Sequence, residues 1–486
     1  MMAEELDELE DDQTAHTGDY LRPPSAWSLA LPYLPWVVVA LLLALGLTWG
    51  YQNLKWSGAL QRRLEAVRAS GQPMQPSELV PPPIPDAENA AFIYQQVFHI
   101  AFGMDAQNDA PLVSGFTKND AKAVAAYVAT GDPEQESTVA AILARPAVQE
   151  ALRIFAEGSQ RRDCQFPVIW ADGPNAAMPH LEKLRASSLM LAAAVRHDFR
   201  QGRREEAMHW AAVGLRMARH AGTDPDRLAG LAQFAMCTTV LRSVREMVCA
   251  VPSPGPHQEL DGALRALDFS GEAEHDLRGE LALEFQVFNS LGQDARTTRA
   301  LLGQDYNNSS DAGRWARYLG PLAAPWRAHD ECVFLDFMSK LQKSQTSPHP
   351  ATRWEEDDLI AGTEQAATGW RAPVSNILVS VYDEYLSKRD LAQAEVSLCE
   401  VALALRDYQA QHGQFPDKLK DLPPPPAGPP VTDLYSGQPL VYHRERTGFM
   451  LYSLGPARRD EEGQPNEDEQ GRVLDTGNIV WSCGEQ

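Results

Sequence analysis

Trp36-Val-Val-Val-Ala-Leu-Leu-Leu-Ala-Leu-Gly-Leu-Thr-Trp49 is the stretch that decides the architecture of this chain. It lies inside a run, residues 23–54, that has no charged side chain. A helix needs about 20 apolar residues to cross roughly 30 Å of hydrocarbon. Aromatic residues at both ends of such a run match the two membrane–water interfaces; here they are Trp27, Tyr33 and Trp36, then Trp49, Tyr51 and Trp56. The sequence therefore predicts a transmembrane helix over residues 27–54.

The residues before this helix are acidic. Residues 1–22 hold eight carboxylates against Arg22, and an acidic block with few apolar residues is typical of a solvated tail. A cleaved signal peptide fits poorly, because the apolar run is too long, an acidic segment precedes it and no A-x-A-like site follows. We expect residues 1–26 to be a disordered tail and the helix to remain as a single-pass anchor.

Residues 55–86 connect the membrane to the body. Leu60, Leu64 and Val67 recur at helical spacing and predict a short amphipathic helix. Prolines are then dense from Pro73 to Pro85, which favours an extended polyproline-type stalk that holds the body off the bilayer.

A succession of amphipathic helices is expected over residues 87–390. Asp86 is the predicted N-cap of a helix that extends to Met104. Two helices around Gly202 resemble a tetratricopeptide-type (TPR-like) hairpin, because small residues in both allow close approach and stacked hairpins build an array. The fold class is therefore mainly α. The clearest further helices are 118–129, 135–144, 178–200, 203–221, 226–250, 274–290, 330–343 and 391–411.

Residues 391–486 differ from the rest in having strand signals. The helix ending near Gln411 runs into His412-Gly-Gln-Phe-Pro416. Alternating apolar residues then predict strands over 440–443 and 449–454, with a third over 479–481. A lone hairpin is marginal in water, so we expect these strands to pack on the helix as a small α+β module with a short antiparallel sheet.

Two motifs of this module carry a resemblance. Asp433-Leu-Tyr-Ser-Gly-Gln-Pro-Leu-Val-Tyr442 and Gly448-Phe-Met-Leu-Tyr-Ser-Leu-Gly455 resemble the C-terminal domain of the major pseudopilin of type II secretion systems. The pseudopilin N-terminal signature is absent, and the membrane helix lies far upstream. In wider organisation the chain looks like a group of large bacterial single-pass membrane proteins that share Glu88-Asn-Ala-Ala91 and this module.

The resemblance implies a calcium site, since pseudopilins of this type bind Ca²⁺ in the acidic loop before the last strand, and Ca²⁺ prefers oxygen ligands. Pro456-Ala457 replaces the aspartate that the family has after Ser-Leu-Gly, so a solvated acidic loop is the alternative. The candidate metal ligands are Asp460, Asp468 and Asp475, with Asn466 and Glu467 beside them.

Two further groups of residues each allow a functional and a purely structural interpretation. Asp163, Cys164 and His180 would suit a Cys/His nucleophilic site, or form a packed turn with a capping histidine. Three histidines on neighbouring helices would suit a metal site, or be surface and satisfied side chains: His197, His209 and His220. No catalytic motif such as H-E-x-x-H, Walker A or G-x-S-x-G occurs, so the sequence offers no chemistry and an enzyme is not the leading hypothesis.

Sidedness depends on two opposed signals. Four basic residues follow the helix (Lys55, Arg62, Arg63 and Arg68), and the positive-inside bias would keep the body in the cytoplasm. The pseudopilin resemblance points outward, and we expect an extracytoplasmic body. The six cysteines have no C-x-x-C spacing; four of them, Cys237, Cys249, Cys332 and Cys399, fit small core residues, and no disulfide framework is expected.

The function classes follow from these features. A net charge of −23 argues against nucleic-acid binding. We expect a membrane-anchored helical scaffold of the bacterial envelope, attached through residues 27–54 and binding protein partners. The alternatives are an envelope hydrolase with its site in a helical cleft and an accessory or structural component of a secretion-type apparatus.

Overall fold

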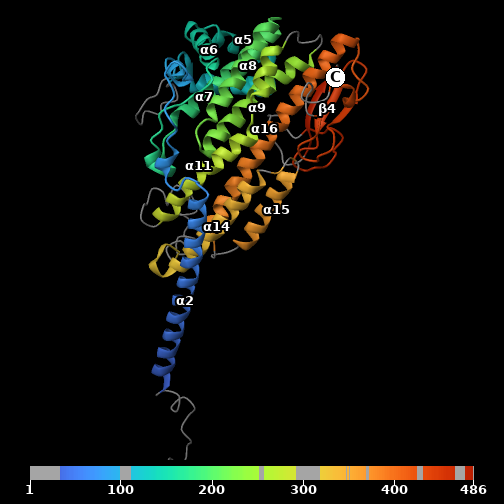
Figure 1. Ribbon diagram of the computed structural model, residues 1–486. Coiled ribbons are helices and arrows are strands. Elements are labelled where there is room, and N and C mark those ends of the chain that lie inside the picture. The colour runs from blue at the N-terminus through green and yellow to red at the C-terminus, as the bar shows by residue number, and fades with distance from the viewer. Residues whose placement is uncertain are drawn as a thin grey trace, which may run out of the picture.

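Helix α2 (Leu34–Ala69) is continuous well beyond the predicted membrane segment. In the described part of the chain it is the one helix long and apolar enough to cross a membrane, and its first half projects from the body (Figure 1). The computed structural model describes residues 33–98, 111–250, 257–291, 318–345, 347, 349, 351–367, 372–423, 431–465 and 477–484.

The body is mainly helical, as predicted. Most predicted helices are confirmed to within a few residues, while α6, α10 and α15 were not predicted. The bounds are α4 (Lys118–Thr130), α5 (Pro133–Leu143), α6 (Pro146–Ser159), α7 (Pro179–Arg200), α8 (Arg204–Ala221), α9 (Arg227–Cys249), α10 (Gln258–Arg265), α11 (Phe269–Ser290), α14 (Ala324–Ser344), α15 (Ala351–Ala366) and α16 (Pro373–His412).

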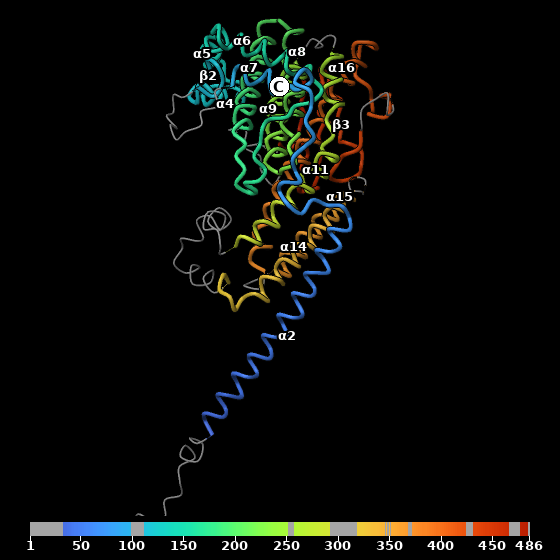
Figure 2. Tube along the Cα trace, turned by 60° about the vertical axis from the view of Figure 1, so that its left-hand side comes forward, coloured from blue at the N-terminus to red at the C-terminus, as the bar shows by residue number. Residues whose placement is uncertain are grey.

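The centre of the body is a three-helix group in which α7, α8 and α9 all pack on one another. Gly202, with a positive φ of 78°, turns the chain between α7 and α8. Buried alanines occur in all three helices, among them Ala193, Ala211 and Ala229. A Cβ at Gly214 of α8 would lie 2.7 Å from Val240 of α9, so this crossing requires glycine. Figure 2 shows the three helices side by side at the core of the body.

The proline-rich segment is not a free stalk, which corrects the prediction. The 3-10 helix η2 (Pro76–Leu79) lies against the body, where Leu79 is buried beside Trp170 of η3 (Trp170–Asn175) and Leu283 of α11. An apolar Leu79 among prolines gives this segment something to bury, so packing is favoured over solvated extension.

The predicted helix after the stalk is also shorter than expected. α3 (Ala90–Tyr94) is capped by Asn89, whose side chain accepts from Ala91 N, and not by Asp86. The stretch 99–104 of that prediction lies outside the described residues. A small hairpin, β1 (Pro111–Val113) and β2 (Phe116–Thr117), was not predicted.

The C-terminal module has the predicted strands. β3 (Val441–Arg444), β4 (Phe449–Ser453) and β5 (Ile479–Cys483) form an antiparallel sheet in that order, preceded by η6 (Leu419–Asp421). The sheet packs on α16 and α9, and Trp481 Nε1 donates to Glu395 Oε2 of α16 at 2.8 Å. Phe449, Leu451 and Trp481 are fully buried, which confirms the expected packing.

Two contacts fasten this sheet to the end of α9. Cys249 and Cys483 form a disulfide, which corrects the prediction that Cys249 is a free core thiol. Arg406 of α16, fully buried, donates to the carbonyls of Val248 and Cys249 and lies over the rings of Phe415 and Phe449. A cation at the negative end of a helix and on aromatic faces is stabilised without a carboxylate.

Candidate functional site

Of the predicted calcium ligands, Asp460 alone lies among the residues that the structure describes. Asp460 is engaged by its own loop, because its Oδ1 accepts from Tyr452 OH and from Glu462 N, both at 2.9 Å. The Asn478 amide binds the same loop, accepting from Glu461 N and donating to Arg459 O. Asp468 and Asp475, with Asn466 and Glu467, lie outside the described residues. Within those that are described, no group of three His, Cys, Asp or Glu side chains is arranged for a metal, and the calcium site stays a prediction.

The proposed Cys164 and His180 pair is placed in one region, though with different partners. His180 Nε2 is 3.0 Å from Asp224 Oδ2, and its ring stacks on Phe166 with centroids 4.4 Å apart. Both His180 and Asp224 are buried. Burial raises the pKa of the Cys164 thiol far above its usual value, so it remains protonated and weakly nucleophilic at neutral pH. The geometry favours the packed-turn interpretation.

Asp163, the third residue of that group, acts through its backbone, whose carbonyl accepts from Ala90 N at 2.9 Å. This contact joins the loop before η3 to the start of α3. Its structural role agrees with the packed-turn alternative.

The three histidines on neighbouring helices face different partners. His197 Nδ1 lies 2.6 Å from Glu136 of α5, and His209 Nδ1 lies 3.0 Å from Glu259 of α10. His220 is bound between Tyr94 OH and Arg161 O, and burial lowers its pKa to about 4. Each histidine thus binds one neighbouring element to the α7–α8 hairpin, as the satisfied-histidine alternative predicts.

A buried acidic cluster, which we did not predict, lies where the α8–α9 loop meets α11. Asp224 and Asp226 of the loop are buried, and Asp226 caps α9 by accepting from Leu228 N. α11 adds buried carboxylates, and a Cβ at Gly279 would clash with the Pro225 carbonyl, so the helix reaches the loop only through glycine. The cluster consists of the half-buried Glu272 and five buried carboxylates, Asp224, Asp226, Asp276, Glu280 and Glu284.

Positive charge beside this cluster comes from Arg227, which binds Glu280 through its backbone N at 2.8 Å and its Nε at 3.5 Å. Burial, and then repulsion from neighbouring carboxylates, raises the pKa of Asp226 to about 7 and that of Glu284 to about 8. The pKa of Glu272 is also raised to about 8, chiefly by burial. The cluster therefore holds protons at neutral pH.

The sequence did contain a signal for this cluster. Glu272, Asp276, Glu280 and Glu284 recur every four residues and so lie on one face of α11. Like charges at this spacing destabilise an isolated helix. Such a stripe usually indicates a solvated face, and here it is turned into the body.

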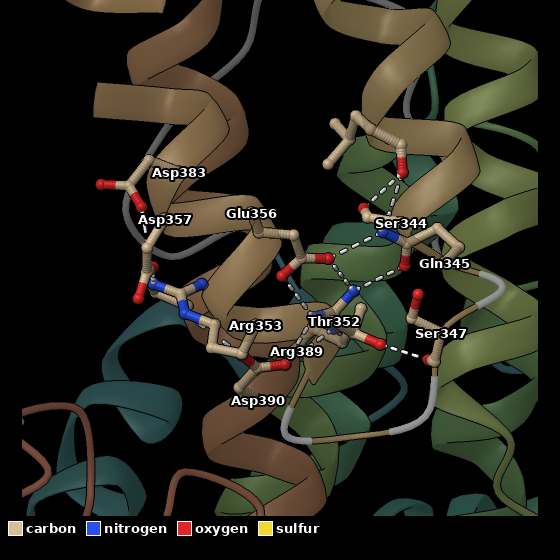
Figure 3. Close-up of polar contacts among 12 residues, drawn as sticks. Ser344, Gln345, Ser347, Thr352, Arg353, Glu356, Asp357, Asp383, Arg389 and Asp390 are labelled. Carbon is tan, nitrogen blue, oxygen red and sulfur yellow. Dashed lines mark hydrogen bonds and ion pairs between the residues drawn. The ribbon is translucent and has the colours of Figure 1, made fainter. Parts of the chain in front are cut away.

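A second buried polar network joins α14, α15 and α16 (Figure 3). Arg389 of α16 donates four hydrogen bonds: two to the carboxylate oxygens of Glu356, at 3.1 and 2.9 Å, and one each to Asp390 and Gln345, both at 2.8 Å. Arg353 adds a second cation 3.6 Å from Asp390. Two cations thus balance two fully buried carboxylates, and the network fixes how the three helices sit together.

Helix α2 enters this region through a parallel pairing with α14. Trp49 Nε1 donates to Leu322 O at 2.7 Å. Seven residues farther along each chain, Trp56 meets the His329 ring with centroids 4.3 Å apart. After another seven, Arg63 binds both oxygens of Asp336 at 2.7 Å. Contacts repeated every seven residues are typical of a coiled-coil seam, so α2 and α14 rise together in register (Figures 1 and 2).

A groove of about 330 Å³ lies beside this pair, between α14 and α15. Its walls combine apolar and charged side chains, with Asp336 shared between the groove and the α2 contact. Phe337 and Leu359 are apolar lining residues, Lys340 and Asp358 are charged ones, and Gly362 also lines the groove.

Comparison with known proteins returned no match to this chain, whether with family models, with curated proteins or with solved structures. Fold and contacts define the class: a mainly helical protein with one apolar N-terminal helix of membrane-spanning length and a small C-terminal antiparallel sheet.

Proposed function

We propose that the protein is a membrane-anchored scaffold of the bacterial cell envelope, whose helical body binds protein partners at a set position above the bilayer. The observation that carries this proposal is the in-register pairing of α2 with α14 from Trp49 to Arg63. Because the anchor continues as one helix to Ala69 and is packed on the body, the body has a defined height and orientation. A flexible tether would give neither.

The Cys249–Cys483 disulfide supports an extracytoplasmic body, since such bonds persist in oxidising compartments. The basic residues after the anchor favour the opposite side, so the question needs a direct test. Protease added to spheroplasts should degrade the body, and mass spectrometry of the non-reduced protein should recover the Cys249–Cys483 peptide. Full protection together with free thiols at both cysteines would place the body in the cytoplasm.

The groove between α14 and α15 is the surface that we assign to a partner. It combines apolar walls, from Phe337 and Leu359, with the charges of Lys340 and Asp358, as a peptide-binding site requires. The α7–α8 hairpin adds a tetratricopeptide-like pair, and stacked hairpins of this kind present extended surfaces to partners.

Two glycines allow a matched test. A Cβ at Gly362, in the groove, or at Gly262, on α10, meets no atom within 4 Å, so each site accepts a photo-crosslinking amino acid. In native membranes, position 362 should give discrete crosslinked species, and position 262 should give none. If the two positions gave the same products, or neither gave any, the groove would not be the partner surface.

An accessory role in a secretion-type apparatus is the second candidate. It is supported by the element order, in which the long helix α16 leads into the sheet β3-β4-β5 as in the pseudopilin domain that the sequence resembles. Crosslinkers on the exposed β3 residue Arg444 should then capture a pilin-like subunit. Capture at position 362 alone would favour the general scaffold.

A further inference from the structure

The turn at the start of α14 has an exposed apolar tip, Pro321 and Leu322. Residues 318–326 (Tyr-Leu-Gly-Pro-Leu-Ala-Ala-Pro-Trp) contain no charged side chain, and the 3-10 helix η5 (Pro321–Ala323) lies at their centre. Leu322 is 74% exposed. Arg327 closes this turn by donating to the carbonyls of Tyr318 and Gly320, each at 2.8 Å. One exposed leucine is ordinary on a protein surface, so the meaning of this tip depends on where it lies relative to the membrane helix.

The contact with Trp49 shows at which height along the axis of α2 this turn lies. Trp49 Nε1 donates to Leu322 O, and Trp49 lies six residues before Lys55, the first charged residue after the apolar run. At 1.5 Å per residue, the turn sits about 9 Å to the membrane side of Lys55. A span of about 20 residues that starts at Leu34 ends near Asn53, so Trp49 and Leu322 fall inside its last turns.

This placement does not depend on one hydrogen bond. The same register is kept at Trp56–His329 and at Arg63–Asp336, so α14 rises beside α2 from the level of Trp49 upward. The start of α14 must therefore be as close to the bilayer as Trp49 is. Trp49 itself is of the type that favours the membrane–water interface.

We infer that η5 and the first turn of α14 enter the bilayer interface as a second lipid contact, separate from the spanning helix. Leu322 and Pro321 would lie between the acyl chains at their headgroup end. Arg327 would lie at the level of the lipid phosphates, where long basic side chains extend toward the polar region. The inference rests on α2 being the membrane anchor of the proposed scaffold. It adds that the body itself touches lipid.

Thiol labelling provides the test, because the protein has a low background. The described free cysteines, Cys164, Cys237, Cys332 and Cys399, are all buried, and Cys249 and Cys483 are joined. Leu322→Cys is the probe. The matched control is Ile169→Cys, which replaces an apolar side chain of similar exposure (68%) before η3; η3 packs on η2, which follows the end of α2 opposite to its apolar half.

Each full-length variant is reconstituted into liposomes at high lipid-to-protein ratio, floated, and treated with a charged maleimide. Leu322→Cys should react at least about tenfold more slowly than Ile169→Cys, because the charged reagent is excluded from the hydrocarbon edge. After unfolding in detergent both should react fully. Both probes sit on one body, so molecules facing inward lower both signals equally. A fluorophore at position 322 should also be quenched by lipids brominated on their acyl chains.

Equal labelling rates in floated protein, without quenching, would overturn the inference and leave the anchor intact. Protection at position 322 that disappears as the lipid-to-protein ratio rises would also overturn it, because a second copy of the chain would then be covering the turn. Failure of the wild type to float would remove both the anchor and this lipid contact.

Discussion

Arg389→Met should destabilise the packing of α15 on α16 severely. Arg389 is 1% exposed, and its partners Glu356 and Asp390 are both fully buried. Methionine keeps part of the aliphatic stem and removes the guanidinium with its four hydrogen bonds. Arg353, 3.6 Å from Asp390, is then the cation that remains beside two buried carboxylates. Removing one partner of a buried ion pair costs about 3–5 kcal/mol.

Hydrogen exchange in α15, followed by mass spectrometry of the detergent-solubilised protein, measures this loss. The expected destabilisation corresponds to local exchange faster by about 2.2 to 3.7 orders of magnitude, since 1.36 kcal/mol is tenfold. Arg153→Met on α6, which breaks exposed pairs with Glu150 and Glu157, is the control and should leave α15 unchanged.

Two further measurements separate a buried-charge effect from lost packing. The double variant Arg389→Met with Glu356→Met should regain about 1–4 kcal/mol, because it removes one of the two stranded carboxylates. Burial already raises the pKa of Glu356, and loss of Arg389 raises it further, so the folded variant binds more protons than the unfolded chain. Its deficit should therefore be larger at pH 8 than at pH 5. If α15 in Arg389→Met exchanged at the wild-type rate, the buried-pair account of this network would be wrong.

Three other predictions follow from the structure. Deletion of residues 27–54 should release most of the protein from membranes as a folded helical species, with at most weak residual lipid binding through η5; tight binding that resists salt and carbonate would contradict a single spanning anchor. Phe449→Ala should cost about 3–5 kcal/mol and expose the C-terminal module, but not α7–α9, to protease; protease resistance equal to wild type would contradict the buried position of this ring. The pKa of Glu284 is raised to about 8, so between about pH 4 and 8 the native state binds more protons than the unfolded chain and loses stability as the pH rises. Glu284→Gln should therefore stabilise the protein at pH 8 and reduce this pH dependence. Glu274→Gln, on the exposed face of the same helix, is the control, and an equal effect of both would exclude the buried cluster as the cause.

The features that could be predicted from the sequence are those with local causes. The long apolar helix α2 follows from one uncharged run, and the strands of the C-terminal module follow from alternating apolar residues between glycine turns. Their packing on α16 could be predicted because a hairpin with one apolar face requires a partner. In each case the deciding information lies within a few tens of residues.

Features that depend on contacts between distant segments could not be predicted. The sequence predicts that the last long helix begins at 391, because Lys388-Arg-Asp390 interrupts the apolar pattern. In the structure α16 begins at Pro373, and Arg389 and Asp390 are buried. The acidic stripe of α11 resembles a solvated face until the α8–α9 loop is placed over it. Nothing local distinguishes Cys249, which pairs with Cys483, from the buried free thiol of Cys237.

The cysteine pair also sets an order of events for an exported chain. Cys249 and Cys483 are separated by 234 residues. At about 5–20 residues per second of synthesis, Cys249 would emerge roughly 12–47 s before its partner. During that interval its thiol is open to oxidants and to other emerging cysteines, and disulfide formation proceeds on the scale of seconds to hours. Biogenesis of this protein would therefore depend on an isomerase, or on early burial of Cys249 at the end of α9. Either would leave the Cys249 thiol available for its disulfide with Cys483 of β5, the last strand to be synthesised.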